Sequence, residues 1–133
     1  MDAAPSAHAA ALWVGLHLAL LLILSVRVVR LRRRHAVTFG HGDIPDLAQA
    51  VRAFGNATEY IPAALIGIVV LALLGAPALL VHATGLLLFA GRVAHAWGLS
   101  RSGGASIPRA VGAVATWLAY IVAAVALIFY AIP

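Results

Sequence analysis

The sequence predicts an all-α integral membrane protein, a bundle of four transmembrane helices that forms a single domain over residues 1–133. Hydrophobic residues make up 64% of the chain and charged residues 10%. Soluble domains contain about 25% charged residues, so a soluble fold is excluded, as are disordered, coiled-coil and collagen-like chains. Four apolar stretches are long enough to cross a bilayer. They predict spans at residues 9–29, 46–75, 77–99 and 108–132.

The first span is apolar from Ala9 to Val26, apart from His17 and Ser25. A secretory signal would carry basic residues before its apolar stretch. The residues before this one contain Asp2 and neither Lys nor Arg. We therefore expect a retained transmembrane helix.

The second and third spans form a helical hairpin. No Asp, Glu, Lys or Arg occurs from Tyr60 to Gly91, but Gly75-Ala76-Pro77 interrupts this stretch. Glycine ends helices and proline begins them, so a tight turn is predicted here. The second helix starts earlier, near Asp46, where Pro45 suits a first helical turn. Its length of about 43 Å exceeds the bilayer core of about 30 Å, so its first turns project from the membrane.

The fourth span follows a basic connection, and basic residues also follow the first span. These residues are Arg27, Arg30, Arg32, Arg33 and Arg34 in the first loop region, and Arg101 and Arg109 in the last. By the positive-inside rule both loops are cytoplasmic, so both termini lie outside. Arg32, Arg33 and Arg34 either set this orientation or bind anionic lipid headgroups.

A few polar residues lie at membrane depth on the second and third helices. Arg52, Asn56 and Glu59 share one helix face. Glu59 lies 17 residues before Ala76 and Arg92 lies 16 residues after it. At 1.5 Å per residue, both are about 24–26 Å from the turn, so we expect Glu59 and Arg92 to pair. The pair either joins two helices or belongs to a site for an anionic ligand, because arginines outnumber carboxylates at this depth.

Two histidines within the spans, His17 and His82, raise the possibility of a haem or metal site. No spacing motif links them, so we favour hydrogen bonding between helices and predict no metal site. The chain has no Cys, which excludes disulfides, thiolate metal ligands and a cysteine nucleophile.

The aromatic and small residues of the spans have structural interpretations. Trp13 lies near a predicted membrane interface, as expected of an aromatic belt residue, whereas Trp117 lies deeper and is expected to pack inside the bundle. Gly85, Gly91 and Gly112 are small residues that allow helices to approach closely.

The polar residues lie in motifs that resemble the MAPEG family, the membrane-associated proteins in eicosanoid and glutathione metabolism. The segment Arg52-Ala-Phe-Gly-Asn56-Ala-Thr-Glu59-Tyr60-Ile-Pro62 resembles the family signature R-x-x-x-N-x-x-E-[YF]-x-P. Gly91-Arg92-Val93-Ala94-His95 is similar to the third helix of the prostaglandin E synthase branch. The resemblance covers nearly the whole chain and is strongest to small bacterial members.

The resemblance implies a homotrimer that holds glutathione between neighbouring subunits, near the cytoplasmic face of a bacterial inner membrane. It assigns ligand contacts to Arg52, Asn56, Glu59 and Tyr60, to Arg92 and His95, and to either Arg27 or Arg30. It also implies that Arg109, at the start of the fourth helix, activates the thiol. A cation beside a thiol stabilises the nucleophilic thiolate.

These observations predict a glutathione-binding membrane protein with glutathione transferase or peroxidase activity toward lipophilic electrophiles. Its expected partners are copies of itself, membrane lipids and a lipophilic small molecule, with no nucleic acid. One alternative is a non-catalytic protein that keeps the MAPEG fold. Another is a small proton-coupled multidrug exporter that uses Glu59, although its carboxylate would then lie at mid-membrane without surplus arginines.

Overall fold

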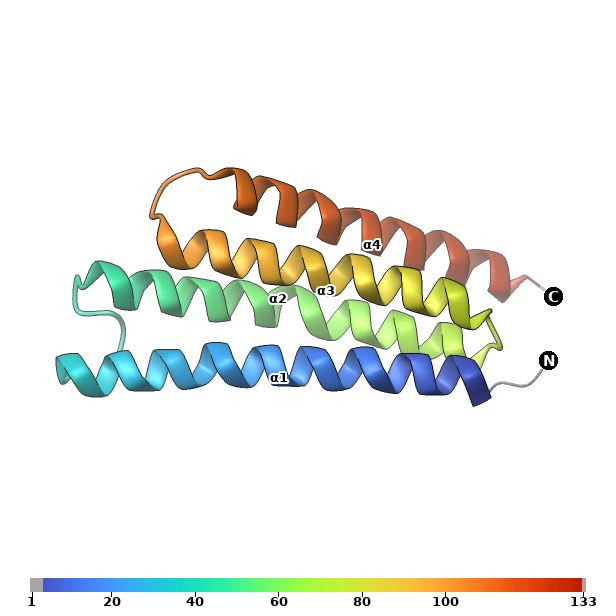
Figure 1. Cartoon of the computed structure of the whole chain (residues 1–133), viewed down its shortest axis with the longest axis horizontal. Coiled ribbons are helices and arrows are strands. Elements are labelled where there is room, and N and C mark those ends of the chain that lie inside the picture. The colour runs from blue at the N-terminus through green and yellow to red at the C-terminus, as the bar shows by residue number, and fades with distance from the viewer. Residues whose placement is uncertain (1–3, 133) are drawn as a thin grey trace.

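The computed structural model describes residues 4–132 and consists of four long helices that lie side by side (Figure 1). They are α1 (Ala4–His35), α2 (Pro45–Leu73), α3 (Ala78–Arg101) and α4 (Ile107–Ala131), and no strand occurs among the described residues. All four are long and apolar enough to cross a membrane. The predicted all-α bundle of four membrane helices is confirmed.

The loops of the chain define two ends of the bundle. The α1–α2 and α3–α4 loops lie at one end, and the α2–α3 turn lies at the other, near the first residues of α1 and the last residues of α4 (Figure 1). We call the halves of the bundle next to these ends the loop half and the turn half. Helix α1 has 32 residues and α2 has 29, against 24 in α3 and 25 in α4. Consequently α1 and α2 extend beyond α3 and α4 at the loop end (Figure 1).

The extra length of α1 changes the interpretation of its basic residues. Arg32, Arg33 and Arg34 lie in the last turn of the helix, not in a loop. The His35 Nε2 atom lies 3.4 Å from an Asp46 carboxylate oxygen, which joins the end of α1 to the first turn of α2. The first turns of α2 therefore pack against α1, in the part of the bundle that α3 and α4 do not reach (Figure 1).

The predicted turn at Gly75-Ala76-Pro77 is confirmed, and its backbone shows why glycine is present. The Ala76 N–H donates to the Leu71 carbonyl at 3.0 Å and the Gly75 N–H to the Ala72 carbonyl at 3.1 Å. This is the Schellman arrangement, which requires a left-handed residue that glycine adopts without strain. Gly75 has φ of +73°. The Ser6 hydroxyl donates to the Ala76 carbonyl at 2.5 Å, which fixes the start of α1 to the turn.

Small residues bring the helices together, as predicted. A Cβ atom at Gly85 would lie 2.2 Å from the Trp13 ring, and one at Gly112 would lie 2.5 Å from the His95 backbone nitrogen. The packing prediction for Trp117 is wrong, whereas the position of Trp13 near a membrane interface stays a prediction. Trp13 is only 7% exposed because its ring packs over Gly85, whereas Trp117 is 54% exposed on the outside of α4.

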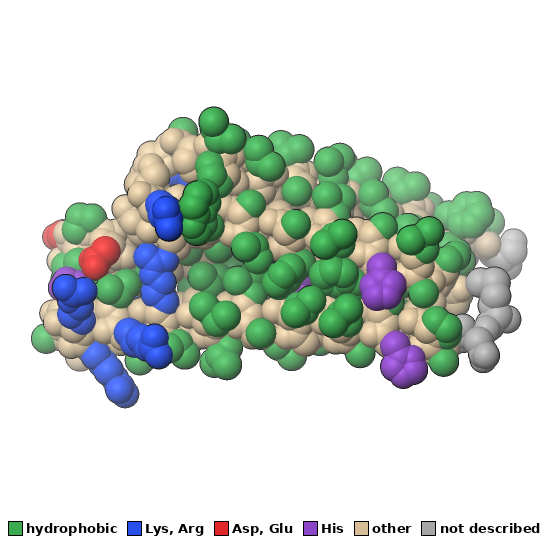
Figure 2. All heavy atoms as spheres, in the orientation of Figure 1, with side chains coloured by type: hydrophobic (Ala, Val, Ile, Leu, Met, Phe, Trp, Pro, Cys, Tyr) green, Lys and Arg blue, Asp and Glu red, His purple; other side chains and the backbone are tan. Residues whose placement is uncertain are grey.

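The outer surface of the bundle is apolar over most of its length. Exposed leucine, isoleucine and valine side chains cover α1 and α4, and the arginines gather at the loop end (Figure 2). Such a surface suits lipid acyl chains or another apolar surface. Helix α3 contacts α1, α2 and α4, but α1 and α4 do not contact each other. The interior therefore lies around α2 and α3, where the polar side chains also meet.

Candidate functional site

Arg92 on α3 is the centre of the polar cluster in the loop half. Its side chain is buried, at 1% exposed, because α2, α3 and α4 all contribute partners to it. One terminal nitrogen donates to Asn56 Oδ1 on α2 at 2.7 Å, and the other donates to Thr116 Oγ1 on α4 at 3.4 Å. The guanidinium carbon also lies 5.3 Å from the centre of the Tyr60 ring. A cation–π contact and neutral oxygens thus hold this charge.

Asn56 connects the buried arginine to an open ion pair. Its Nδ2 atom donates to one carboxylate oxygen of Glu59 at 3.3 Å. The other Glu59 oxygen accepts from Arg52 at 3.1 Å. The side chains of Arg52 and Glu59 are 61% and 52% exposed. The result is one chain of contacts that runs from an exposed cation through a carboxylate and an amide to a buried cation.

The predicted ion pair between Glu59 and Arg92 is wrong. Counting residues from the turn places both at the same height, but height does not fix the direction of a side chain around its helix. Asn56 points toward α3 and is buried, whereas Glu59 lies farther around α2 and is exposed. Asn56 therefore accepts the hydrogen bond from Arg92, and Glu59 pairs with Arg52.

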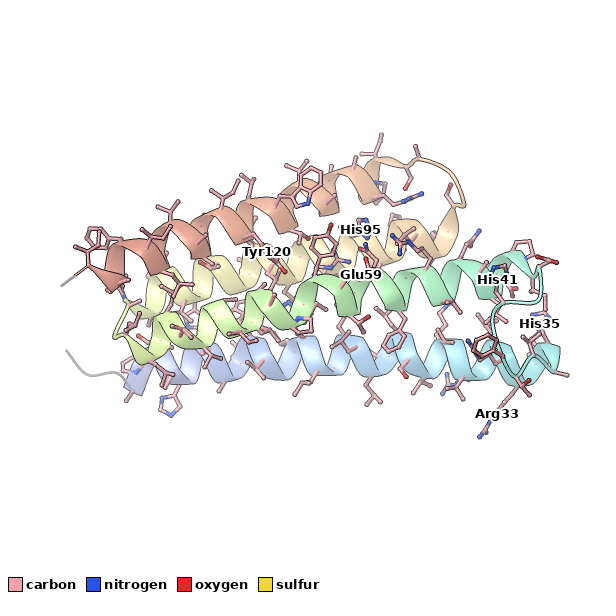
Figure 3. All side chains as sticks on the ribbon, turned by 180° about the vertical axis from the view of Figure 1, so that it is seen from behind. Arg33, His35, His41, Glu59, His95 and Tyr120 are labelled. Carbon is pink, nitrogen blue, oxygen red and sulfur yellow. The ribbon has the colours of Figure 1, made fainter. Side chains whose placement is uncertain are left out.

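A cavity of about 140 Å³ lies beside Arg92 between α2, α3 and α4. It has room for a few water molecules or one small polar group, since a water molecule occupies about 30 Å³. Its lining residues are Asn56, Tyr60, Arg92, His95, Ala113, Thr116 and Trp117. Glu59, His95 and Tyr120 lie in the same part of the bundle (Figure 3). Asn56 lines this cavity and also contacts Glu59, so it links the cavity to the exposed Arg52–Glu59 pair.

Two residues of α4 complete the cluster and were missed by the sequence interpretation. Thr116 is buried and contacts Arg92, and the Tyr120 hydroxyl donates to the Tyr60 carbonyl at 2.6 Å. The only signal available was their spacing. Gly112, Thr116 and Tyr120 recur every four residues on a helix that is mostly apolar after Arg109, and residues four apart share a helix face.

His95 is the remaining predicted ligand contact on α3, and it lies in the cluster. It is one turn beyond Arg92, half-buried, with its Nδ1 atom 3.5 Å from an Arg92 terminal nitrogen. The structure thus gathers six predicted site residues in the loop half. They are Arg52, Asn56, Glu59, Tyr60, Arg92 and His95.

The other three predicted site residues lie apart from the cavity. Arg109 donates a hydrogen bond to the Gly104 carbonyl of the α3–α4 loop, and its backbone packs against Gly98. Arg27 donates to the Ser100 carbonyl at the end of α3, at 3.3 Å. Arg30 is exposed. None of the three is among the residues that line the cavity.

The two histidines in the turn half behave differently from each other. His82 Nδ1 accepts from Trp13 Nε1 on α1 at 3.2 Å, which is the predicted interhelical bond. The His17 prediction is wrong, because its Nδ1 atom lies 2.7 Å from the Trp13 carbonyl of its own helix. Its ring packs edge-on against Phe89 at 5.3 Å. Within residues 4–132 no three His, Asp or Glu side chains are grouped as metal ligands.

Comparison with known proteins places these features in context. A sequence model of the MAPEG family matches residues 10–129. The chain is also 37% identical over 120 residues to Inner membrane protein YecN of Escherichia coli strain K12, a match that covers 90% of each chain. The protein of the same name from Escherichia coli O6:H1 strain CFT073 matches equally well, with 37% identity over 120 residues.

Proposed function

The chain belongs to the MAPEG family, and we propose that it binds glutathione on the face of α2 that carries Arg52, Asn56 and Glu59. We further propose that it uses the bound thiolate against lipophilic electrophiles or hydroperoxides. The contact chain from Arg52 to Arg92 is the observation that carries this proposal. It contains one carboxylate and two arginines, and its exposed end is open to a ligand.

The charges of this contact chain match those of the tripeptide. Within residues 4–132 Arg92 has no carboxylate partner, since the ion pairs there are His35–Asp46 and Arg52–Glu59. A buried cation of this kind favours a ligand that brings a carboxylate. Arg52 can bind a carboxylate of glutathione in a bidentate manner, and Glu59 can accept from the γ-glutamyl ammonium group. The Asn56 amide can donate to a carboxylate of glutathione and accept from its ammonium group.

Arg109 is the proposed thiolate-stabilising residue. In the transferase reaction the thiol loses its proton to solvent and the thiolate stabilised by Arg109 attacks an electrophilic carbon. A carbon–sulfur bond forms, and the leaving group departs with its electron pair. In the peroxidase reaction two glutathione molecules are oxidised to the disulfide while a hydroperoxide is reduced to an alcohol and water. In both, the reactive sulfur comes from the ligand, in agreement with a chain that has no Cys.

The proposed assembly is a homotrimer in a bacterial inner membrane, with the loop end in the cytoplasm and the termini outside. A neighbouring subunit would then supply the arginine of α1. Arg30 suits this better than Arg27, because Arg30 is exposed whereas Arg27 is half-buried and bound to Ser100. The gathering of arginines at the loop end supports this orientation (Figure 2).

Calorimetric titration of glutathione into the detergent-solubilised trimer tests binding. We expect saturable binding that is weakened at least tenfold in Arg52→Ala and unchanged in Arg34→Ala, which removes the same charge from the exposed end of α1. Equal affinities in the two variants would contradict the proposed binding face.

A second candidate is a MAPEG protein that binds glutathione without catalysing a reaction. The position of Arg109 favours it, because its guanidinium donates to the Gly104 carbonyl and Arg109 is not among the residues that line the cavity. Ultraviolet difference absorbance of the thiolate, with turnover of an aryl halide, separates the two candidates. Binding with no thiolate signal, and no difference between wild type and Arg109→Ala, would favour the non-catalytic protein. The exporter is less well supported, because Glu59 is paired with Arg52.

A further inference from the structure

An apolar groove runs along the outer face of α3. Helix α3 contacts both α1 and α4 while those two helices do not contact each other, so this face lies at the bottom of a valley between them. The groove has a volume of about 560 Å³ and is lined by Phe89, Ala90, Val93, Ala94 and Trp97. From Phe89 to Trp97 it extends about 12 Å along the helix axis. It shares no lining residue with the cavity beside Arg92.

Two arginines lie at the loop end of this groove. The guanidinium carbon of Arg101 lies 4.6 Å from the centre of the Trp97 ring, which is half exposed. Arg27 on α1 reaches across to the Ser100 carbonyl at 3.3 Å. Neither arginine takes part in an ion pair within residues 4–132. The apolar groove therefore ends in an aromatic ring and two cations that lack carboxylate partners there.

This arrangement matches an amphiphile with an anionic head. Arginines between membrane helices bind anionic lipid headgroups on the cytoplasmic side, and tryptophan lies at the level of the headgroups. Free phosphate would occupy the arginines but leave the apolar groove unfilled. A second copy of the chain would cover the groove, but it offers few carboxylates to the two arginines. Within residues 4–132 the chain has three carboxylates, and two of them, Asp46 and Glu59, already have partners. Charge complementarity thus favours a lipid.

We propose that this groove binds one anionic phospholipid. Its phosphate contacts Arg101 and Arg27, and one acyl chain lies along α3 from Trp97 toward Phe89. Hydrophobic side chains cover the bundle up to the arginines at the loop end, so the boundary between head and chain coincides with the change in surface chemistry (Figure 2). None of the residues that line the groove belongs to the contact chain from Arg52 to Arg92, so lipid binding and glutathione binding can be tested separately.

Quenching of Trp97 fluorescence by phospholipids with brominated acyl chains tests the proposal. The experiment uses the full chain in phosphatidylcholine nanodiscs, in a Trp117→Phe background that leaves Trp97 as the exposed tryptophan, since Trp13 is buried. We expect brominated phosphatidylglycerol to quench at a severalfold lower mole fraction than brominated phosphatidylcholine. Arg101→Gln should reduce this preference about fivefold, the effect of one interfacial arginine.

Two further variants separate a built site from general surface charge. Arg33→Gln removes the same charge from the exposed end of α1, outside the groove, and should keep the preference. Ala94→Leu fills the groove without changing charge and should lose the quenching while the protein remains monodisperse on gel filtration. Arg27 is left intact because it is also a candidate glutathione contact.

Four results would overturn the proposal. Equal quenching by the two lipids would show that the groove does not select an anionic headgroup. An equal loss in Arg33→Gln and Arg101→Gln would assign the preference to overall charge. Full competition by inorganic phosphate would indicate a site for free anions. Absence of quenching by either lipid, together with cross-links between copies through position 94, would show that a second copy covers this face.

Discussion

Central side chains are fully buried in both halves of the bundle, but the two halves differ in the chemistry of those side chains. In the turn half the centre is mostly apolar, with Ile68, Leu71 and Val81 all at 0% exposed beside the buried His17. In the loop half the largest fully buried side chain is Arg92, at 1% exposed. A membrane provides little hydrophobic driving force between helices, so close packing and hydrogen bonds must hold the turn half together. The comparison shows one half built mainly from apolar packing and the other built around a buried charge.

The largest loss of stability is expected from one methyl group added at the α3–α4 contact in the loop half. In Gly112→Ala the new Cβ would lie 2.5 Å from the His95 backbone nitrogen and 2.6 Å from the Gly91 carbonyl oxygen. Because backbone atoms cannot move aside, we expect a loss of about 3 kcal/mol in unfolding free energy, the upper end of overpacking effects. Denaturant unfolding in detergent measures it.

Gly67→Ala is the matched control for that variant. Its Cβ would lie 3.5 Å from a Leu127 methyl group, an ordinary contact. Alanine favours a helix over glycine, so this variant should be unchanged or more stable by up to about 1 kcal/mol. Equal destabilisation of the two variants would contradict the assignment of the close contact to Gly112.

Arg92→Met separates the function of the loop half from its stability. Removing the charge should weaken glutathione binding at least tenfold, since hydrogen bonds to charged groups contribute about 1.5–3 kcal/mol. Stability should change by less than about 1 kcal/mol, because the variant also removes a buried cation that has no carboxylate partner within residues 4–132. Titration calorimetry and unfolding are measured on the same preparation. Strong destabilisation with unchanged binding would assign Arg92 to structure alone.

Glu59→Gln tests the open end of the contact chain. The neutral amide cannot pair with the ligand's ammonium group, so we expect affinity for glutathione to fall about tenfold. Unfolding should change by less than about 1 kcal/mol, as for other exposed ion pairs. Asp46→Asn removes the same charge from the first turn of α2, away from the cavity, and should bind normally. A normal affinity in Glu59→Gln would exclude the proposed ammonium contact.

Ser6→Ala should have the smallest effect and act only on the turn half. It removes the hydrogen bond to the Ala76 carbonyl, for which we expect a loss of about 1 kcal/mol in unfolding free energy. Glutathione affinity should not change, because Ser6 lies at the opposite end of the bundle from the loops. A reduced affinity in this variant would show that the two halves are coupled.

The fold could be predicted from the sequence because it depends on one-dimensional features. Hydropathy locates the helices, and Gly75 with Pro77 locates the turn. The residues gathered around Arg92 could also be predicted as a group, since their heights follow from residue counts along α2 and α3. The resemblance to the MAPEG family added Tyr60 to that group.

The pairing of these residues could not be predicted from counts, because pairing depends on rotation about each helix axis. Asn56 and Glu59 differ by less than one turn in height, yet only Asn56 contacts Arg92. The α4 contribution was also missed. Gly112 lets α4 approach α3, which brings Thr116 into contact with Arg92, and such closeness appears only when two helices are packed together.

The four-residue connection between α2 and α3 has a consequence for how the protein is made. Residues 74–77 join the two helices so tightly that α2 and α3 can enter the bilayer as a pair during synthesis. In that pair Asn56 and Tyr60 already stand beside Arg92. A lone arginine in a nascent helix would be costly to place in lipid. Joint insertion gives the charge its neutral partners at once, before α4 has left the ribosome.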